Sequence, residues 1–336
     1  MSLFCGAGGL DRGFKDAGFP LALAIDSSAA AIETHKRNFP RTDSTTADLI
    51  KLGPAGVLER LGGRVDPGSA IGVIGGPPCQ GFSRANTAAR SDDPRNELPS
   101  LYLRIIDELR SSYDVEFVVF ENVLGIKDRK HLDTFATIVD GLRDMNFTVT
   151  ERELCALDFA VPQSRRRIVL IGMRSGRGYG PIKIRKRSGK RTVREAIEGL
   201  PEPVLFRRDL TADDFDVHPN HWTMQPRSFR FVSGEADDFD GRSFKRLDWD
   251  KPSPTIAFGH REILVHPSGK RRLSILEAMR LQGFPDEYVL EGNLSEQVEQ
   301  VSNAVPPPLA RSVANAVNHS LNTREGSARR RAAGSY

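Results

Sequence analysis

The chain has 336 residues, of which 39% are hydrophobic and 27% charged, and its formal net charge is +4. This balance is typical of a soluble globular protein with a real core, and the length suits two lobes. No apolar run is long enough to cross a membrane, and the three cysteines form no Cys-x-x-Cys pair. We therefore expect a cytoplasmic protein with no membrane segment, disulfide framework or metal site.

The first half of the chain alternates short apolar runs with helical patterns, which is typical of a parallel sheet covered on both faces. The strands that we expect are 2–5, 21–25, 45–47, 70–74, 116–120, 148–154 and 168–173. The helices that we expect between them are 10–17, 29–38, 98–112 and 132–145. The sequence thus predicts an α/β fold with a doubly wound, mostly parallel, Rossmann-like sheet.

The second half has a different pattern. Gly, Pro and charged residues dominate from Met173 to about Pro267, which favours a smaller, irregular, β-rich lobe. Ser274 and Glu277 have the spacing of a capping box, so a helix should begin there, and a last helical pattern follows Pro308. We expect four parts: a catalytic domain at 1–177, a second domain at 178–290, a segment that returns to the first domain at 291–322, and a basic, disordered tail at 323–336.

The first chemical pattern is the glycine-rich stretch Leu-Phe-Cys-Gly-Ala-Gly-Gly at 3–9. It follows a strand and opens a helix, so its backbone can approach a nucleotide-like ligand closely. Asp26 ends the second strand, where a carboxylate can bind ribose hydroxyls, and Asp48 ends the third, where it can meet an adenine amino group. Nicotinamide and flavin enzymes share this pattern, and a tight turn without a ligand also remains possible.

The second pattern, Val-Ile-Gly-Gly-Pro-Pro-Cys-Gln-Gly-Phe-Ser at 73–83, places Cys79 where a strand reaches the carboxyl end of the sheet. Pro77 and Pro78 fix the backbone before it, so the direction of the thiol is set before a substrate arrives. A thiolate is a nucleophile, and basic neighbours stabilise it. We predict a reactive Cys79 and regard Cys5 and Cys155 as packing residues.

Two further patterns reach the same edge of the sheet. The apolar strand Phe-Val-Val-Phe-Glu-Asn-Val carries Glu121. Burial would raise the pKa of this carboxyl, so that it can give a proton to a ring nitrogen. The stretch Gln-Ser-Arg-Arg-Arg begins another strand, in which Arg165 and Arg167 share one face and Arg166 takes the other. Paired guanidinium groups can hold a carbonyl oxygen, a carboxylate or a phosphate.

Basic residues are concentrated between Ser164 and Arg194, a stretch that contains no acid. Such a stretch suits phosphates and would make binding depend on salt, although a solvated face explains it equally well. Its members are Arg165, Arg166, Arg167, Arg174, Arg177, Lys183, Arg185, Lys186, Arg187, Lys190, Arg191 and Arg194.

Taken together, these motifs resemble those of the bacterial DNA (cytosine-5) methyltransferase family. They follow the order of that family over nearly the whole chain: Phe-x-Gly-x-Gly-Gly at 4–9, Pro-Pro-Cys-Gln at 77–80, Glu-Asn-Val at 121–123, Gln-x-Arg-x-Arg at 163–167, Arg-x-Leu-x-x-x-Glu at 271–277, Arg-Leu-Gln-Gly-Phe-Pro at 280–285 and Gln-Val-Ser-Asn-Ala-Val-Pro-Pro at 300–307. The resemblance implies a monomeric enzyme that methylates C5 of cytosine in a specific double-stranded DNA sequence with S-adenosylmethionine, in a restriction-modification system or as a solitary methylase.

The resemblance also implies roles for individual residues. Cys79 would attack C6 of a cytosine flipped out of the duplex, while Glu121 protonates N3. Arg167 would hold O2, with Arg165 and Gln163 ordering the catalytic loop and a phosphate. The cofactor would be held by Phe4, Gly6, Gly8, Gly9, Asp26, Ser27, Asp48, Pro78, Leu98 and Asn303. The DNA contacts would be Ser83, Arg95, Thr255, Lys183, Arg185 and Lys186.

Residues 178–267 correspond to the variable target-recognition segment of that family, whose polar side chains read base edges. The candidate readers are Thr192, Arg194, His218, Asn220, His221, Arg227, Arg230 and Arg261. One departure concerns the start of the chain, because the family has more apolar residues before its glycine-rich loop. The first strand should therefore be short, and whether the natural start lies upstream of Met1 stays open.

Two alternatives remain. A tRNA-methylating branch resembles this family and shares its chemistry, but it usually carries a Cys-Phe-Thr segment that is absent here. A non-catalytic DNA-binding homologue would generally lack the cysteine or the acid, and this chain has Cys79, Glu121 and Arg167.

Overall fold

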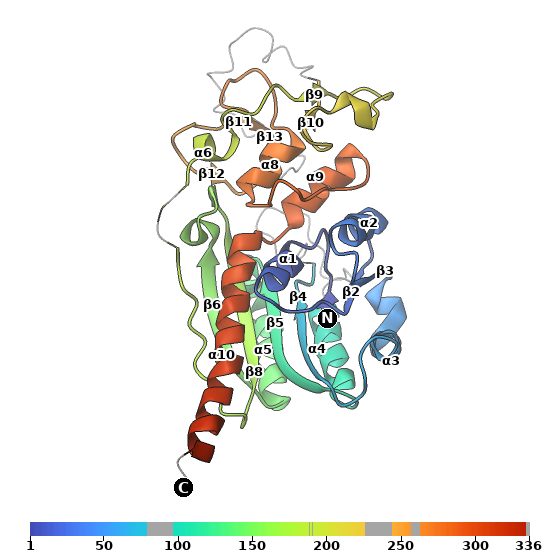
Figure 1. The fold of residues 1–336 in the computed structure, drawn as a ribbon, viewed down its shortest axis with the longest axis vertical. Helices are drawn as coiled ribbons and strands as arrows, with labels where there is room; N and C mark the ends of the chain where they lie inside the picture. The colour runs from blue at the N-terminus through green and yellow to red at the C-terminus, as the bar shows by residue number, and fades with distance from the viewer. Residues whose placement is uncertain (79–96, 188, 190, 226–243, 257–262, 334–336) are drawn as a thin grey trace.

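A computed structural model describes residues 1–78, 97–187, 189, 191–225, 244–256 and 263–333 (Figure 1). Its largest element is a seven-stranded sheet in the order β3-β2-β1-β4-β5-β8-β6. The strands are β1 (Ser2–Leu3), β2 (Leu23–Asp26), β3 (Asp43–Thr46), β4 (Ala70–Gly75), β5 (Asp114–Asn122), β6 (Phe147–Cys155) and β8 (Arg166–Arg174). Neighbours pair in parallel except β8, which is antiparallel to both β5 and β6. The predicted doubly wound, mostly parallel sheet is confirmed.

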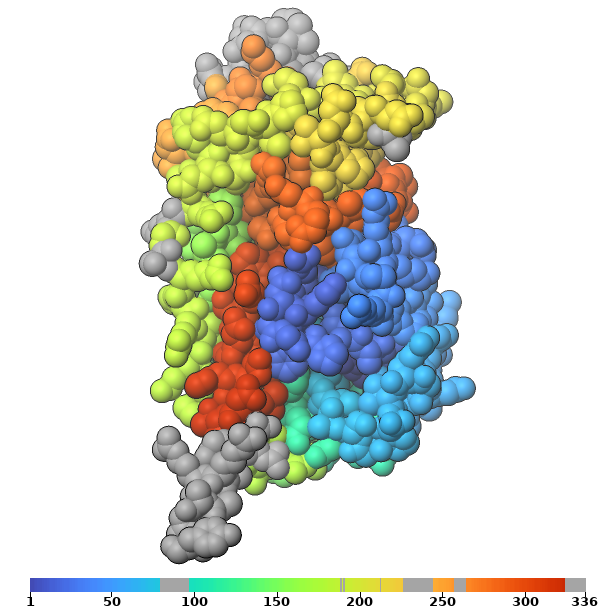
Figure 2. Space-filling model, in the orientation of Figure 1, coloured from blue at the N-terminus to red at the C-terminus, as the bar shows by residue number. Residues whose placement is uncertain are grey.

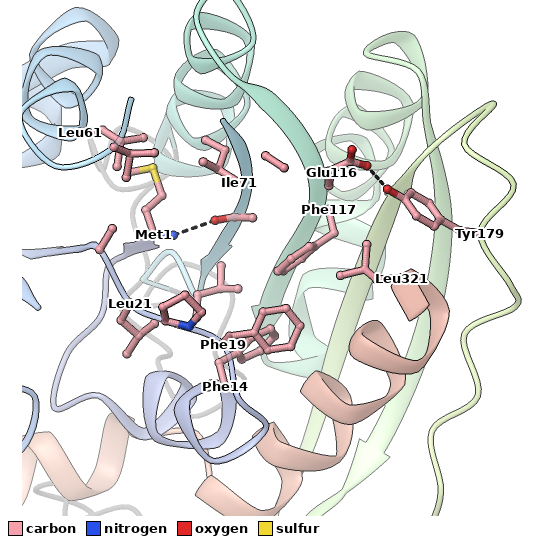
Figure 3. Close-up of a pocket in the computed structure, with 16 residues that line it drawn as sticks. Met1, Phe14, Phe19, Leu21, Leu61, Ile71, Glu116, Phe117, Tyr179 and Leu321 are labelled. Atoms are coloured by element: carbon pink, nitrogen blue, oxygen red, sulfur yellow. Dashed lines mark hydrogen bonds between the residues drawn. The ribbon is translucent and has the colours of Figure 1, made fainter. Parts of the chain in front are cut away.

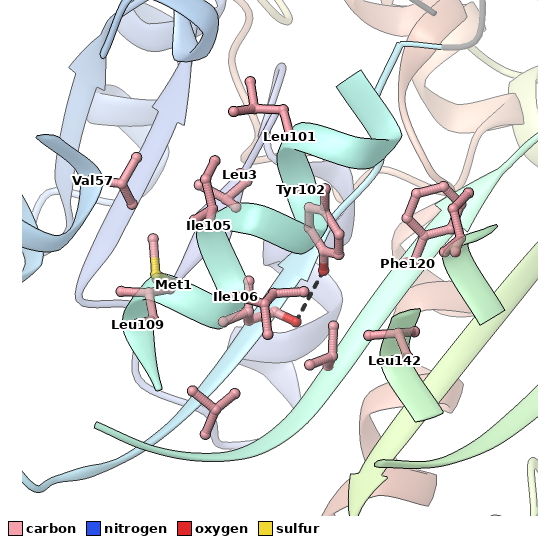
Figure 4. Close-up of a cluster of buried hydrophobic side chains, with 14 of the residues drawn as sticks. Met1, Leu3, Val57, Leu101, Tyr102, Ile105, Ile106, Leu109, Phe120 and Leu142 are labelled. Atoms are coloured by element: carbon pink, nitrogen blue, oxygen red, sulfur yellow. Dashed lines mark hydrogen bonds between the residues drawn. The ribbon is translucent and has the colours of Figure 1, made fainter. Parts of the chain in front are cut away.

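Helices cover both faces of this sheet (Figure 1). They are α1 (Gly9–Asp16), α2 (Ala29–Asn38), α3 (Leu49–Gly62), α4 (Leu98–Leu109), α5 (Leu132–Asp144) and α10 (Pro307–Ala333). One buried cluster, which includes Leu3, Tyr102 and Phe120, lies between the sheet and α3, α4 and α5 (Figure 4). A second cluster, which includes Phe14 and Val313, lies under α1 and α10. The apolar spacing of each helix thus serves one face of the sheet.

Two helices are not among those that we expected. The first is α3, whose apolar pattern is interrupted by Gly53 and Pro54; Gly53 has φ 65° and kinks the element. The helix α9 (Leu294–Asn303) was also missed, although Asn293 and Glu296 form a capping box at its start. The last helix, α10, extends to Ala333.

The second lobe is built from short elements. Its strands are β9 (Val204–Leu205), β10 (Trp222–Thr223), β11 (Phe244–Arg246), β12 (Ser253–Pro254) and β13 (Ile263–Val265), with β7 (Gln163–Ser164) pairing to β12. Its helices among the described residues are α6 (Val193–Ile197) and α8 (Ile275–Leu281). The 3-10 helices in the described part of the chain are η2 (Leu124–Lys127), η3 (Arg129–His131), η4 (Ala156–Phe159) and η5 (Ala212–Asp214). The predicted capping box of Ser274 and Glu277 at α8 is confirmed.

The two lobes share a buried core. The cluster that contains Trp222, Met279 and Val301 also contains Ala7 and Phe39 from the first lobe. In the space-filling view, α8 and α9 (orange) lie between the second lobe and the N-terminal part of the first (Figure 2). None of the helices in the described ranges is long and apolar enough to span a membrane.

The first strand is short, as predicted. β1 has two residues, whereas its neighbour β4 has six. Beside its start lies a largely apolar cavity of about 690 Å³, whose walls include Leu21, Ile71 and Phe117 (Figure 3). The amino group of Met1 donates a hydrogen bond of 2.7 Å to the Gly72 carbonyl at this cavity, and burial lowers the pKa of that amino group to about 6. The cavity thus lies where a longer first strand would pass between β2 and β4.

Extending the chain by Val-Ile-Val before Met1 should therefore stabilise the fold by about 1–2 kcal/mol, because buried apolar side chains outweigh the cost of ordering three residues. The gain should be larger at pH 6 than at pH 8. The folded-state pKa of the Met1 amino group lies below its unfolded value, so its contribution to stability is lost as the pH falls from 8 to 6, and a peptide bond removes this titration. Thermal unfolding at both pH values measures the effect. A Gly-Ser-Gly extension is the control, and equal melting temperatures for the two extensions would contradict this use of the cavity.

Candidate active site

The glycine-rich loop joins β1 to α1 at the carboxyl edge of the sheet. Phe4, Gly6 and Gly8 have φ values of 54°, 52° and 78°. A positive φ is uncommon for a bulky residue such as Phe4 and often marks a functional site. Gly8 also has no room for a side chain, because a Cβ there would lie 2.6 Å from the Phe39 ring and 2.8 Å from the Tyr288 hydroxyl. The shape of this loop is therefore held by α2 and by the segment that follows α8.

Asp26 ends β2 and faces this loop. Its carboxylate accepts hydrogen bonds from the backbone N–H groups of Gly6, at 2.8 Å, and Ser28, at 2.9 Å. Burial raises the pKa of the Asp26 carboxyl, and these hydrogen bonds oppose the rise. The remaining lone pairs of the carboxylate can still accept hydrogen bonds from the hydroxyls of a ligand.

The other predicted cofactor residues are spread along the same edge. We expected Asp48 to end β3, and this is wrong. Asp48 caps the start of α3, where its side chain accepts a hydrogen bond of 2.9 Å from Ile50 N. Ser27, Pro78 and Asn303 are exposed, Phe4 is half-buried, and Leu98 is buried at the first turn of α4. Asn303 is the last residue of α9, and the next residue, Ala304, lies against Gly9.

Glu121 lies near the end of β5 and is 8% exposed. The loop that follows β4 passes directly over it, since a Cβ on Gly76 would lie 2.9 Å from Glu121 Oε2. The side chain of Asn122 donates a hydrogen bond of 3.2 Å to the Pro77 carbonyl. The loop that carries Cys79 therefore leaves the sheet beside Glu121. Cys79 itself, with Ser83 and Arg95, lies outside the described residues.

Arg167 contacts this carboxyl group, with its Nε 2.9 Å from Glu121 Oε1. Burial raises the pKa of Glu121, while the positive charges of Arg167 and Arg165 oppose the rise without cancelling it. Arg166 points the other way and is exposed, with Glu153 at 3.4 Å. The predicted alternation of the three arginines is confirmed.

Gln163 and Arg165 are buried and connect the sheet to the second lobe. The Gln163 side chain accepts a hydrogen bond from Ile256 N at 3.1 Å and donates one to Gln282 Oε1 at 2.8 Å. Arg165 donates to the carbonyls of Ile256, at 3.4 Å, and Ser302, at 2.8 Å. In this structure both side chains therefore bind protein groups of the second lobe and of α9.

The predicted DNA contacts lie in different environments. Thr255 donates a hydrogen bond of 2.9 Å to the Ser164 carbonyl. Lys183, Arg185 and Lys186 are exposed on the chain that runs from β8 up to α6, and Lys186 lies 3.0 Å from Asp158. Since the neighbouring Ile182 is buried in the cluster under α10, this chain packs one face inward and presents its cations outward.

For three of the candidate base readers the prediction is wrong. His218, Asn220 and His221 are buried, and their polar atoms have partners inside the protein: Tyr288 O at 3.2 Å, Leu290 O at 2.9 Å and Pro201 O at 2.8 Å, respectively. They support the fold because a buried polar group needs such a partner.

The remaining candidate readers divide into two groups. Thr192 caps α6, and Arg194 pairs with Asp250 at 2.8 Å. Arg227, Arg230 and Arg261 lie outside the described residues.

Sequence reasoning missed Tyr288. Its hydroxyl donates a hydrogen bond to the carbonyl of Ala7 in the glycine-rich loop, 281 positions away in the chain. No local pattern distinguishes such a tyrosine from an ordinary core residue.

Of the other two cysteines, Cys5 is buried, and burial raises the pKa of its thiol, which fits the packing role we predicted. Within the described ranges no cluster of His, Cys, Asp and Glu has the arrangement of a metal site.

Replacing Glu121 with Gln should change how stability depends on pH. Because the folded-state pKa of this carboxyl is raised, the wild type should lose stability relative to Glu121→Gln as the pH rises from about 4.5, the usual pKa of a glutamate, toward neutral pH. Melting temperatures of both proteins across this range measure the difference, and Glu151→Gln, on the exposed edge of β6, is the control. A constant difference between wild type and Glu121→Gln would contradict the raised pKa.

The sequence matches the family described as C-5 cytosine-specific DNA methylase over residues 1–319. It is similar to the Type II methyltransferase M1.HphI of Haemophilus parahaemolyticus, with 34% identity over 97% of this chain and 87% of that protein. It is also similar to M.MthTI of Methanothermobacter thermautotrophicus, with 32% identity over 95% of this chain and 97% of that protein. A crystal structure described as a DNA modification methyltransferase encoded within an E. coli prophage matches with a TM-score of 0.76 and 26% identity, covering 96% of this chain and 98% of that one. Since the family match spans nearly the whole chain, this protein belongs to the C-5 cytosine-specific DNA methylase family.

Proposed function

We propose that this DNA cytosine-5 methyltransferase works through a transient bond between Cys79 and C6 of a cytosine flipped out of a specific double-stranded sequence. The observation that carries the proposal is the buried carboxyl of Glu121, which lies against Gly76 at the base of the Cys79 loop. A nucleophile and a proton donor that serve one pyrimidine ring must lie at the same edge of the sheet, and the chain leaves the sheet toward Cys79 beside this carboxyl.

The chemistry explains why both groups are needed. C5 of cytosine is a poor nucleophile. Addition of the Cys79 thiolate to C6 converts C5 into an enamine-like, nucleophilic carbon. Glu121 gives a proton to N3 during that addition, so negative charge does not build up on the ring. Loss of the C5 proton after methylation then expels the thiolate. The base must leave the duplex, because Cys79 cannot reach C6 inside the stack.

Arg167 lies beside Glu121, and this contact by itself favours the ionised carboxyl, whereas burial opposes it. Burial favours the protonated form of Glu121, and a protonated carboxyl does not need Arg167 as a counterion. When the base enters and Glu121 holds its proton, the guanidinium is available to donate hydrogen bonds to the cytosine O2. Arg165 and Gln163 hold the second lobe against this strand from the protein side.

The residues at the glycine-rich loop fit S-adenosylmethionine, which supplies an electrophilic methyl group when bound. Phe4 presents an aromatic ring, and the carboxylate of Asp26 has lone pairs left for ribose hydroxyls. Ser27, Pro78 and Asn303 are exposed, and Leu98 is buried at the first turn of α4. Asp48 would meet the adenine amino group from the start of α3.

We propose that the enzyme acts as a cytoplasmic monomer, as part of a restriction-modification system or as a solitary methylase. Its second lobe would read the target sequence. The names of its relatives as Type II methyltransferases support the first of these two settings.

Cys79→Ala should abolish methylation, because no other group in the proposed site can add to C6. Bisulfite sequencing of a plasmid from a host that expresses each protein measures this and maps the target sequence. The wild type should protect cytosines at one sequence, and Cys79→Ala should protect none.

Cys155→Ala is the matched control, since it removes a thiol from the end of β6 and should leave methylation unchanged. A duplex with 5-fluorocytosine at the mapped site should trap a denaturation-resistant adduct with wild type and Cys155→Ala only. Methylation by Cys79→Ala would exclude the covalent mechanism.

Neutralising Lys183, Arg185 and Lys186 with Gln should flatten the salt dependence of DNA binding. Each lost phosphate contact should lower the slope of log K against log salt by about 0.9. Fluorescence anisotropy with a labelled duplex at several salt concentrations measures the slope. Neutralising Arg60 on α3, Arg64 in the loop after α3 and Arg143 on α5 removes the same charge elsewhere and is the control. Equal slopes for the two variants would assign the three residues to solvent.

A further inference from the structure

Tyr288 joins the second-lobe core to the glycine-rich loop. It lies shortly after α8, and its side chain is fully buried in the cluster that contains Trp222 and Met279. Its hydroxyl donates a hydrogen bond to the carbonyl of Ala7. Its ring packs between two aromatic neighbours, with the centroid of Phe284 at 4.9 Å and that of Phe39 at 6.2 Å. A residue from one lobe thus contacts the backbone of the loop that belongs to the other.

The backbone around Tyr288 is held from both lobes. We call residues 288–290 the linking segment. From α2, the Asn38 side chain donates to Val289 O at 2.7 Å and accepts from Val289 N at 3.1 Å. From the second lobe, Asn220 donates to Leu290 O and accepts from Leu290 N, both at 2.9 Å.

His218 completes the second-lobe side of this attachment, because its Nε2 lies 3.2 Å from Tyr288 O. His218 and Asn220 are two of the residues that the sequence suggested as base readers. Their actual partners fix the linking segment in one position relative to both lobes. Buried hydrogen bonds of this kind leave little freedom for independent movement of the segment.

The glycine-rich loop packs tightly against Tyr288 and Phe39. A Cβ on Gly8 would lie 2.8 Å from the Tyr288 hydroxyl and 2.6 Å from Phe39, so the loop is in direct contact with the ring. Ala7, whose carbonyl accepts the hydrogen bond, is itself part of the second-lobe core. A small movement of the second lobe would therefore be transmitted to the backbone that carries Gly6 and Gly8.

We propose that Tyr288 is a positioning residue that couples target binding by the second lobe to cofactor binding at the glycine-rich loop. The inference rests on the proposed function, which places the cofactor at the loop and DNA at the second lobe. Coupling of this kind is reciprocal: DNA tightens cofactor binding by the same factor by which the cofactor tightens DNA binding.

Tyr288→Phe tests the proposal, because it removes one hydroxyl and keeps the ring. The probe is S-adenosylhomocysteine, measured by calorimetry without DNA and with a duplex that carries the mapped sequence. We expect Kd without DNA to rise about three- to ten-fold, the effect of one neutral hydrogen bond, and the tightening by DNA to shrink. The KM for S-adenosylmethionine should rise while kcat stays within about two-fold, because Tyr288 does not touch the reacting atoms.

Tyr102→Phe is the matched control. Tyr102 lies on α4 in the cluster between that helix and the sheet (Figure 4) and is equally buried. Its hydroxyl donates to the carbonyls of Val119, at 2.9 Å, and Val73, at 3.4 Å, in the sheet core. Both variants should lose similar thermal stability, whereas only Tyr288→Phe should change the Kd values. If Tyr288→Phe behaves like Tyr102→Phe in both Kd measurements, Tyr288 only packs and the proposal is overturned.

Asn38→Ala provides a second route if Tyr288→Phe does not fold, because it frees Val289 without changing the ring. It should weaken the tightening by DNA, and unchanged tightening would also overturn the proposal. A wild-type protein that binds no S-adenosylhomocysteine would instead refute the proposed function, so the two failures are distinguishable.

Discussion

The site depends on one buried carboxyl group, that of Glu121. Taking a carboxylate out of water is costly, and the protein meets that cost with Arg167 at 2.9 Å and with the charge of Arg165 further away. The balance still favours the protonated form relative to a free glutamate. Everything around it follows from this requirement: an apolar strand to bury the group, a glycine at position 76 to let the loop pass over it, and a strand with alternating arginines beside it.

The two lobes are held together by polar groups as much as by apolar packing. Gln163 and Arg165 reach from the sheet to Ile256 and Ser302, and the linking segment is held by Asn38 on one side and Asn220 on the other. Buried polar contacts are directional, so they fix the relative position of the lobes more strictly than a purely apolar interface would. Such an arrangement suits the proposed function, in which a target base, the Cys79 thiol and a cofactor are aligned at one edge of the sheet.

Much of the fold was predictable, for a simple reason. In a parallel sheet the carboxyl ends of the strands meet at one edge, so residues such as Asp26, Pro78 and Glu121 could be assigned to one region from their positions after apolar runs. The prediction failed where a local pattern was broken. Gly53 and Pro54 interrupt the apolar pattern of α3, and that helix was not predicted.

The sequence by itself determined the fold class, the order of the motifs and the identity of the chemical groups, because these depend on residue type and on spacing along the chain. Only the tertiary structure decided which polar groups are satisfied inside the protein. His218, Asn220 and His221 look like surface readers in the sequence, yet they are buried against backbone carbonyls, and Tyr288 finds its partner 281 residues away. Partners so distant in the chain meet only when the lobes close on one another, and no local pattern encodes that closure.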